Sequence, residues 1–311
     1  MRTPSSSLNL VSRREILAAG GMLCLLPSLS QAAWSPQSHV TLGLITDLHY
    51  GEADPRGTRF YRESLGKLRE AVQSFKQAKV DAVIELGDLI DSADSQSAVD
   101  ELRFLEKVMT ELRTVEAPRG FTIGNHCLTK VARPDFLRAV GQPRGHHTMQ
   151  LGAWTVIILD ACHKSDGTPY SAGNFSWDDT DIPAKQRDWL AHELKVASDH
   201  VLVCVHQRVD WTSPNRPTTG VASAPAIREI LEQSKKVRVV LQGHTHQNDY
   251  SYLKDIHYVT LRAAVEGSGE ANNGYSLLSL YEDGTALLRG HREQLSRKLS
   301  SQDEIAWPAS R

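Results

Sequence analysis

The sequence lacks three features that would each point to a particular class of protein. Cysteine is scarce: the 311 residues include four, too few for a disulfide framework to hold a chain of this length. No charge dominates, since 35 Lys+Arg face 37 Asp+Glu, and this balance argues against binding to long nucleic acids. Internal repeats and low-complexity segments are absent as well. With 40% hydrophobic and 23% charged residues, the chain has the composition of a globular protein that buries its own core.

The N-terminus carries a pattern typical of protein export. Arg13 and Arg14 precede the apolar segment Ile16–Leu29, which is too short to span roughly 30 Å of hydrocarbon comfortably. This arrangement resembles the twin-arginine export signal. Ser30-Gln31-Ala32 then supplies small residues for cleavage after Ala32. We therefore predict that residues 1–32 are a twin-arginine-type export signal.

This prediction names a partner and a location. The partner is the twin-arginine export machinery, and the mature protein is expected in the periplasm or outside the cell, with no stable membrane anchor after cleavage. The alternatives are an uncleaved membrane anchor, a basic cytosolic N-terminus and a lipoprotein site at Cys24. The twin-arginine route exports proteins that have already folded. A metal ion could therefore be bound inside the cell, before export.

Hydrophobic periodicity predicts alternating strands and helices in the first half of the chain, which is typical of parallel βαβ units. The last part is rich in strands and predicts a second, more antiparallel sheet. A polar tail at 293–311 shows no periodicity and predicts no regular structure. The expected strands are 40–46, 80–86, 121–123, 147–151, 153–159, 201–205, 237–241, 256–262, 275–281 and 285–289. The expected helices are 61–79, 96–115, 183–197 and 224–233.

Five short polar motifs lie at or just after the ends of these strands. They are Asp47-Leu48-His49, Gly87-Asp88, Gly124-Asn125-His126, His206 and Gly243-His244-Thr245-His246. Because ligands of open α/β sheets bind outside the carboxyl ends of the strands, we expect the motifs to converge at one edge. In an extended segment residues i and i+2 point the same way, so both members of Asp-x-His and His-x-His can face that edge. The glycines allow sharp turns and a close approach of the backbone.

The converging side chains define a metal chemistry. They offer carboxylate, amide and imidazole donors and no thiolate, which suits Mn, Fe, Zn, Co or Ni and argues against a thiolate-rich structural zinc site. Seven ligands are more than one tetrahedral ion needs, whereas two ions about 3.5–4 Å apart, bridged by a carboxylate, fit the number. We predict two divalent or trivalent metal ions, with Mn, Fe and Zn as candidates. The predicted ligands are Asp47, His49, Asp88, Asn125, His206, His244 and His246.

With these motifs in this order, residues 40–290 resemble the calcineurin-like metallophosphoesterase superfamily. The resemblance implies an α/β fold, a four-layer α/β/β/α sandwich with two mixed sheets, and we place this domain at residues 40–292. Position by position, it implies one ion held by Asp47, His49, Asp88 and His246, and a second held by Asp88 as the bridge, Asn125, His206 and His244.

The resemblance also implies a mechanism. His126 matches the family histidine that protonates the leaving oxygen or holds the transition-state phosphoryl group, and Asp88 and Asn125 join it as catalytic residues. Hydroxide formed on the two ions would attack directly, without a covalent intermediate. The family usually has an acidic residue after Asn-His, whereas this chain has Cys127, so the groups that surround His126 are left undefined.

The segment Gly57–Leu65 (GTRFYRESL) resembles the manganese-dependent ADP-ribose/CDP-alcohol diphosphatase branch, as do Gly87–Asp91 and Gly141–Gly145. That branch typically has Gln where this chain has His49. The resemblance implies a small phosphodiester or phosphoanhydride substrate of the ADP-ribose or CDP-alcohol type. Arg59, with its planar donor fork, is the predicted substrate contact together with Asn125 and His126. The alternative places Arg59 on a solvated helix face.

Other functions stay open. A phosphomonoesterase or a cyclic-nucleotide phosphodiesterase of the same superfamily would use the same ligands, and a non-catalytic metal-binding scaffold is a further alternative. A purple acid phosphatase would carry a tyrosine where this chain has Asp91. Trp177 lies in a polar loop and is a candidate wall of the substrate pocket.

Overall fold

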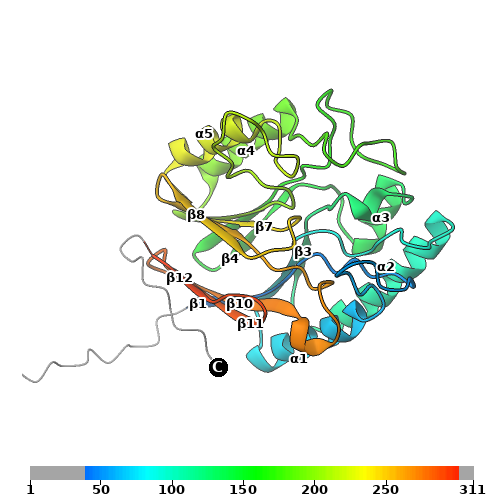
Figure 1. The fold of residues 1–311 in the computed structure, drawn as a ribbon. Coiled ribbons are helices and arrows are strands. Elements are labelled where there is room, and N and C mark those ends of the chain that lie inside the picture. The colour runs from blue at the N-terminus through cyan, green and yellow to red at the C-terminus, as the bar shows by residue number, and fades with distance from the viewer. Residues whose placement is uncertain (1–38, 301–311) are drawn as a thin grey trace, which may run out of the picture. The chain divides into compact units, whose positions relative to one another are not determined.

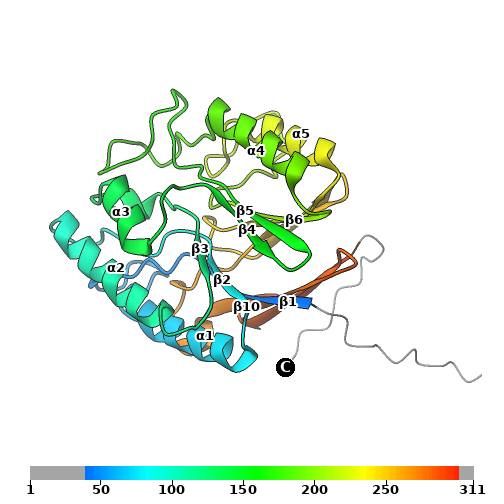
Figure 2. The ribbon, with the colours of Figure 1, turned by 180° about the vertical axis from the view of Figure 1, so that it is seen from behind.

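The computed structural model describes residues 39–300, in which two six-stranded sheets lie face to face (Figure 1). The predicted export signal at residues 1–32 lies outside the described residues. Helices cover the outer face of each sheet, as the view from behind also shows (Figure 2). The predicted four-layer α/β/β/α sandwich with two mixed sheets is confirmed.

The first sheet has the order β12-β11-β10-β1-β2-β3. Strands β1, β2 and β3 run parallel. Strand β10 pairs antiparallel with β1, β11 with β10, and β12 with β11. Its strands are β1 (His39–Ile45), β2 (Ala82–Glu85), β3 (Arg119–Phe121), β10 (Gly274–Tyr281), β11 (Ala286–Arg292) and β12 (Arg297–Leu299). The helices on this side are α1 (Ser64–Ala78), α2 (Ala98–Leu112) and α3 (Arg133–Val140), with a 3-10 turn, η1, at His126–Leu128.

The second sheet has the order β4-β5-β6-β7-β9-β8. Strands β5, β6, β7 and β9 run parallel, and β4 and β8 are antiparallel edge strands. Its strands are β4 (His147–Leu151), β5 (Trp154–Ile158), β6 (His200–Cys204), β7 (Val237–Gln242), β8 (Asp249–Leu253) and β9 (Ile256–Thr260). The helices on this side are α4 (Ala184–Val196) and α5 (Ala224–Ser234). A second 3-10 turn, η2 (Glu270–Asn272), lies against α1 and β11 on the side of the first sheet.

Three apolar layers hold these elements together. One layer lies between the two sheets, and it includes Leu44, Ile84 and Leu202. The other two lie between each sheet and its helices. Because side chains of a strand alternate between its faces, Ile84 points to the layer between the sheets while Val83 points to the helices. Both sheets are therefore buried on both faces, which explains the nearly continuous apolar runs of their central strands.

Helices α1 and α2 follow from local sequence. The apolar side chains of α1 recur at helical spacing, and Leu68, Val72 and Phe75 are buried against the first sheet. Ser97 caps α2, its hydroxyl accepting a hydrogen bond from the main-chain N–H of Asp100. None of the helices between residues 39 and 300 is both long and apolar enough to cross a membrane.

Two sequence predictions about the C-terminal part need correction, and two elements elsewhere in the chain were missed. The late strands do not form a sheet of their own, because β10 pairs with β1 along seven residues while β8 and β9 join the other sheet. Residues after 292 are not wholly irregular, since β12 pairs with β11. The short helix α3 and the edge strand β8 were not predicted. Both edge strands β8 and β12 are polar and short, so the hydrophobic pattern does not mark them.

Candidate metal centre

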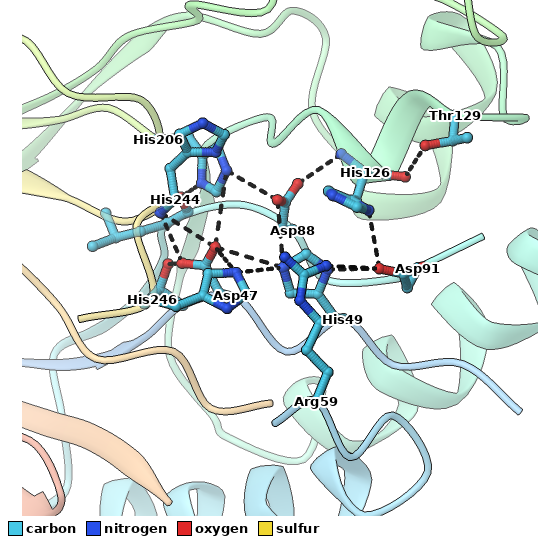
Figure 3. Close-up of polar contacts among 12 residues, drawn as sticks. Asp47, His49, Arg59, Asp88, Asp91, His126, Thr129, His206, His244 and His246 are labelled. Atoms are coloured by element: carbon cyan, nitrogen blue, oxygen red, sulfur yellow. Dashed lines mark hydrogen bonds and ion pairs between the residues drawn. The ribbon is translucent and has the colours of Figure 1, made fainter. Parts of the chain in front are cut away.

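The five motifs meet at the carboxyl ends of β1, β2, β3, β6 and β7, as predicted. Side chains from both sheets point toward a common centre (Figure 3). Three overlapping groups of side chains could each hold a metal ion: Asp47, His49 and His246; His49, Asp88 and His126; and Asp88, His206 and His244. The first and third groups follow the two ligand sets expected from the sequence.

The backbone that presents these ligands is not extended, which corrects the reason given for the i, i+2 spacing. Asp47, His49, His244 and His246 all lie beyond the strand ends and have φ values of 50°, 43°, 70° and 63°. These are left-handed conformations, in which Asp and His are enriched among non-glycine residues. The chain turns at each ligand, so both members of each pair reach the centre from irregular backbone.

Glycines provide the close approach that the sequence predicted. Gly87 has φ of 105°, and a Cβ there would lie 2.4 Å from Nδ1 of His206. A Cβ on Gly124 would lie 2.1 Å from Oδ1 of Asp88. Larger residues at either position would push a predicted ligand out of place.

The first ligand set brings together Asp47, His49 and His246. Nε2 of His49 lies 3.0 Å from Nε2 of His246, and Nε2 of His246 lies 3.4 Å from Oδ1 of Asp47. Asp47 and His49 are fully buried. Burial alone would raise the pKa of Asp47, but His206, His246 and His49 outweigh it and hold that pKa well below its usual value. Three potential metal-ligand atoms thus face one another, and one of them carries the buried negative charge of Asp47.

The second ligand set shows most clearly that its residues suit a cation. Nε2 of His206 lies 3.1 Å from Oδ2 of Asp88 without hydrogen-bond geometry. Nε2 of His244 and Oδ1 of Asn125 are also buried and have no hydrogen-bond partner among residues 39–300. Buried donors and acceptors in proteins are almost always paired. Metal ions are the partners that suit these imidazole and amide atoms, so the residues fit the predicted centre.

Asp88 links the two sets. Its Oδ2 lies 3.1 Å from Nε2 of His206 and 3.5 Å from Nε2 of His49, while its Oδ1 accepts a hydrogen bond of 2.8 Å from the main-chain N–H of His126. The position between His206 and His49 is the one required of a bridging carboxylate.

Three of the imidazoles are oriented by hydrogen bonds at Nδ1, the ring nitrogen that is not turned toward the predicted metal position. Nδ1 of His206 donates to the main-chain oxygen of Leu86 at 2.7 Å. Nδ1 of His49 donates to Oδ2 of Asp91 at 2.9 Å, and Nδ1 of His246 donates to Oε1 of Glu266 at 2.6 Å. A proton fixed on Nδ1 leaves the lone pair of Nε2 for a metal.

Asp91 also defines the surroundings of His126, which the sequence left open. Its Oδ2 lies 2.9 Å from Nδ1 of His126. Burial would lower the pKa of His126, but Asp88 and Asp91 raise it above its usual value, so a cationic imidazole is favoured there. Cys127 is fully buried in the apolar layer under the first sheet. It is one of three free cysteines among the described residues, the others being Cys162 and Cys204.

A cleft of about 970 Å³ opens over the centre. Arg59 lines it, and its side chain extends toward His49 (Figure 3), with Nη1 3.7 Å from Oδ2 of Asp91. Arg59 lies before α1, so the alternative that placed it on a solvated helix face is wrong. Trp177 lines the same cleft and is 48% exposed. Tyr61, in contrast, is buried core.

Sequence reasoning gave no role to three residues that the structure places in or beside the centre. They are Asp91, Glu266 and Arg262. Glu266 and Arg262 follow β9 outside any recognisable motif, and the sequence carried no signal for them. Asp91 lies three residues after Asp88, within the Gly87–Asp91 segment. That spacing does not predict its contacts with His49 and His126, which follow other strands.

Comparisons with known proteins agree with this geometry. A family model described as calcineurin-like phosphoesterase matches residues 40–248. A manganese-dependent ADP-ribose/CDP-alcohol diphosphatase of Arabidopsis thaliana is 25% identical, over 82% of this chain and 95% of that protein. A 3',5'-cyclic-nucleotide phosphodiesterase of Nostoc is 23% identical, over 79% of this chain and 90% of that protein.

The same fold occurs in the crystal structure of a dimetal phosphatase from Danio rerio. That structure has a TM-score of 0.69 and 21% sequence identity, and the match covers 84% of this chain and 99% of the other. The chain therefore belongs to the calcineurin-like phosphoesterase family. It is a metal-dependent hydrolase of phosphoric esters or diphosphates.

Proposed function

We propose that the protein hydrolyses small phosphodiesters or phosphoanhydrides of the ADP-ribose or CDP-alcohol type, with two metal ions drawn from Mn, Fe and Zn. The observation that carries the proposal is the set of buried, unpartnered donor atoms around Asp88, beneath a cleft that Arg59 lines. The named activity of the Arabidopsis relative, which matches most of both chains, supports the substrate class.

When the two ions are bound, they supply an activated water and neutralise charge on the phosphoryl oxygens. The side chains of the protein perform the remaining tasks. Oδ2 of Asp91 lies at ion-pair distance from Nδ1 of His126, which leaves Nε2 to donate a proton to the leaving oxygen. Asp88 and Asp91 raise the pKa of His126 above its usual value despite its burial, which favours this role. Asn125, at the end of the β3 loop, lines the cleft beside His126 and contacts the substrate there.

A substrate panel tests this proposal. The purified mature chain is assayed with Mn against ADP-ribose, CDP-choline, cyclic AMP and p-nitrophenyl phosphate, with Asp88→Asn as the inactive control. The diphosphates are expected to give the highest kcat/KM. A clear preference for p-nitrophenyl phosphate would contradict the proposal and indicate a phosphomonoesterase.

One observation favours a second candidate, a cyclic-nucleotide phosphodiesterase. His49 offers an imidazole at a ligand position, 3.0 Å from Nε2 of His246, where the diphosphatase branch typically has Gln. The Nostoc relative is a named cyclic-nucleotide phosphodiesterase. Preferential hydrolysis of cyclic AMP in the same panel would establish this function instead.

We also propose export through the twin-arginine machinery to the periplasm or the cell exterior. Arg13, Arg14 and the small residues Ser30 and Ala32 support this proposal. Replacing both arginines by lysine is expected to retain the protein inside the cell, uncleaved. Fractionation of a bacterial host, with detection of the C-terminus, measures the outcome. Unchanged export of the double variant would contradict it.

A further inference from the structure

Arg262 is a second arginine, besides Arg59, whose guanidinium lies at the cleft. It is not one of the residues around Asp88. It follows β9, and its side chain lines the same cleft as Arg59. Its Nη1 donates to the main-chain oxygen of His246 at 3.3 Å, so the guanidinium lies beside the backbone of a predicted ligand. The aliphatic stem packs on Gly274, where a Cβ would lie 2.9 Å from Cγ of Arg262. Gly274 therefore leaves room for the arginine.

Arg262 forms no close ion pair, although it lies near enough to Glu266 to help lower the pKa of that carboxyl. No carboxylate in the described part of the chain lies within ion-pair distance of it, and its Nε is buried without a hydrogen-bond partner there. Glu266 lines the same cleft, but its Oε1 is engaged by His246. Arg59 differs, because it has Asp91 at 3.7 Å. Because the guanidinium lines the cleft and forms no close ion pair there, it is available to an anionic group of a ligand.

We propose that Arg262 binds the phosphate that is not attacked in a diphosphate-bridged substrate. This inference rests on the proposed function and adds a residue that selects diphosphates over single phosphoesters. Arg59 lies beside Asp91, near His126, and serves the reacting phosphoryl group. Arg262 lies beside the His246 backbone and meets the adjacent phosphate. A monoester or simple diester has no second phosphate to offer it.

The test compares inhibitors that differ by one phosphate. The metal-loaded enzyme hydrolyses bis(p-nitrophenyl) phosphate as a reporter, and α,β-methylene-ADP or AMP competes with it. In Arg262→Gln the inhibition constant of α,β-methylene-ADP is expected to rise about tenfold more than that of AMP. Arg262→Lys keeps the charge but not the fork, so it should restore part of the loss. Arg289→Gln, on an exposed position of β11, is the matched control.

The outcomes separate this inference from the proposed function. Equal changes for both inhibitors in Arg262→Gln, or the same values as in Arg289→Gln, would overturn the role of Arg262 even if ADP-ribose is a good substrate. If the native enzyme fails to hydrolyse ADP-ribose and CDP-choline, yet α,β-methylene-ADP still depends on Arg262, the proposed substrate fails while the second phosphate site stands. Thermal unfolding of each variant checks that it folds.

Discussion

Oδ2 of Asp91 lies 2.9 Å from Nδ1 of His126, and the same oxygen accepts a hydrogen bond from Nδ1 of His49. One carboxylate therefore orients both a predicted metal ligand and the predicted proton donor. The pKa of Asp91 is held well below its usual range because His126 and His49 outweigh the effect of its burial. The carboxylate stays ionised and can hold both rings at neutral pH.

Replacing Asp91 by Asn should impair catalysis without unfolding the chain. The amide keeps the shape but loses the charge that favours a cationic His126, and kcat/KM should fall roughly 10–100-fold at saturating metal. Steady-state kinetics with bis(p-nitrophenyl) phosphate measures the change. Asp94→Asn makes the same substitution at an exposed position and should have little effect. A loss in Asp91→Asn no greater than in that control would show that Asp91 does not position His126.

Removing the metal ions should destabilise the fold as well as abolish activity. Asp47 and Asp88 are buried within the same cluster, and cations would neutralise their charges. A ligand at 100 times its Kd stabilises a protein by about 2.7 kcal/mol. The melting temperature is expected to fall after chelation and to recover when Mn is restored. A melting temperature that ignores chelation would contradict the presence of the site.

Trp177→Ala should weaken the binding of nucleotide substrates. The exposed ring lines the cleft with its centroid 6.1 Å from that of His244, where it can stack on a base. Stacking of a base on an aromatic ring contributes roughly 1–3 kcal/mol, so KM for ADP-ribose should rise at least fivefold. Trp177→Phe should retain most of the affinity. Tyr252→Ala, which removes an exposed ring of β8, is the control. Equal KM values in all three variants would remove Trp177 from the substrate site.

Lys67→Met should destabilise the loop that carries Glu266. The buried Lys67 ammonium donates to the main-chain oxygens of Ala264, Glu266 and Gly267 at 2.7–2.8 Å. Methionine leaves these oxygens without donors, and the free energy of unfolding should fall by about 3 kcal/mol. Urea denaturation measures it, with Lys76→Met on the exposed end of α1 for comparison. Equal stabilities of the two variants would refute this role.

Glu101 should make stability depend on pH. Burial raises its pKa from the usual 4.5 to about 7, so the folded chain holds this proton more tightly than the unfolded chain. The resulting contribution is complete below pH 4.5 and is lost as pH rises to about 7. Glu101→Gln cannot ionise and should lack this decline. The free energy of unfolding of both proteins, measured from pH 4.5 to 8, tests this, and parallel curves would contradict it.

The sequence predicted the fold correctly where an apolar run marks a buried strand and a polar motif marks the end of that strand. Apolar runs followed directly by Asp47 or His206 marked buried parallel strands, and such strands must end at one edge. The sheet assignment of β10 could not be predicted, because pairing with β1 depends on which long-range partner buries it best. The role of Glu266 could not be predicted for a related reason. Its contact with His246 joins two irregular segments that follow different strands, and no periodicity describes those segments.

The chain holds its predicted metal ligands at a cost in folding stability. The backbone is left-handed at five of these residues: Asp47, His49, Asp88, His244 and His246. Such conformations cost of order 1–3 kcal/mol each and persist only where the surroundings enforce them. A descendant released from selection for hydrolysis could gain stability by accepting glycine at these positions. Loss of the reaction would then be hard to reverse, because each restored ligand would first weaken the fold. Catalytic decay in such a lineage is expected to proceed in one direction.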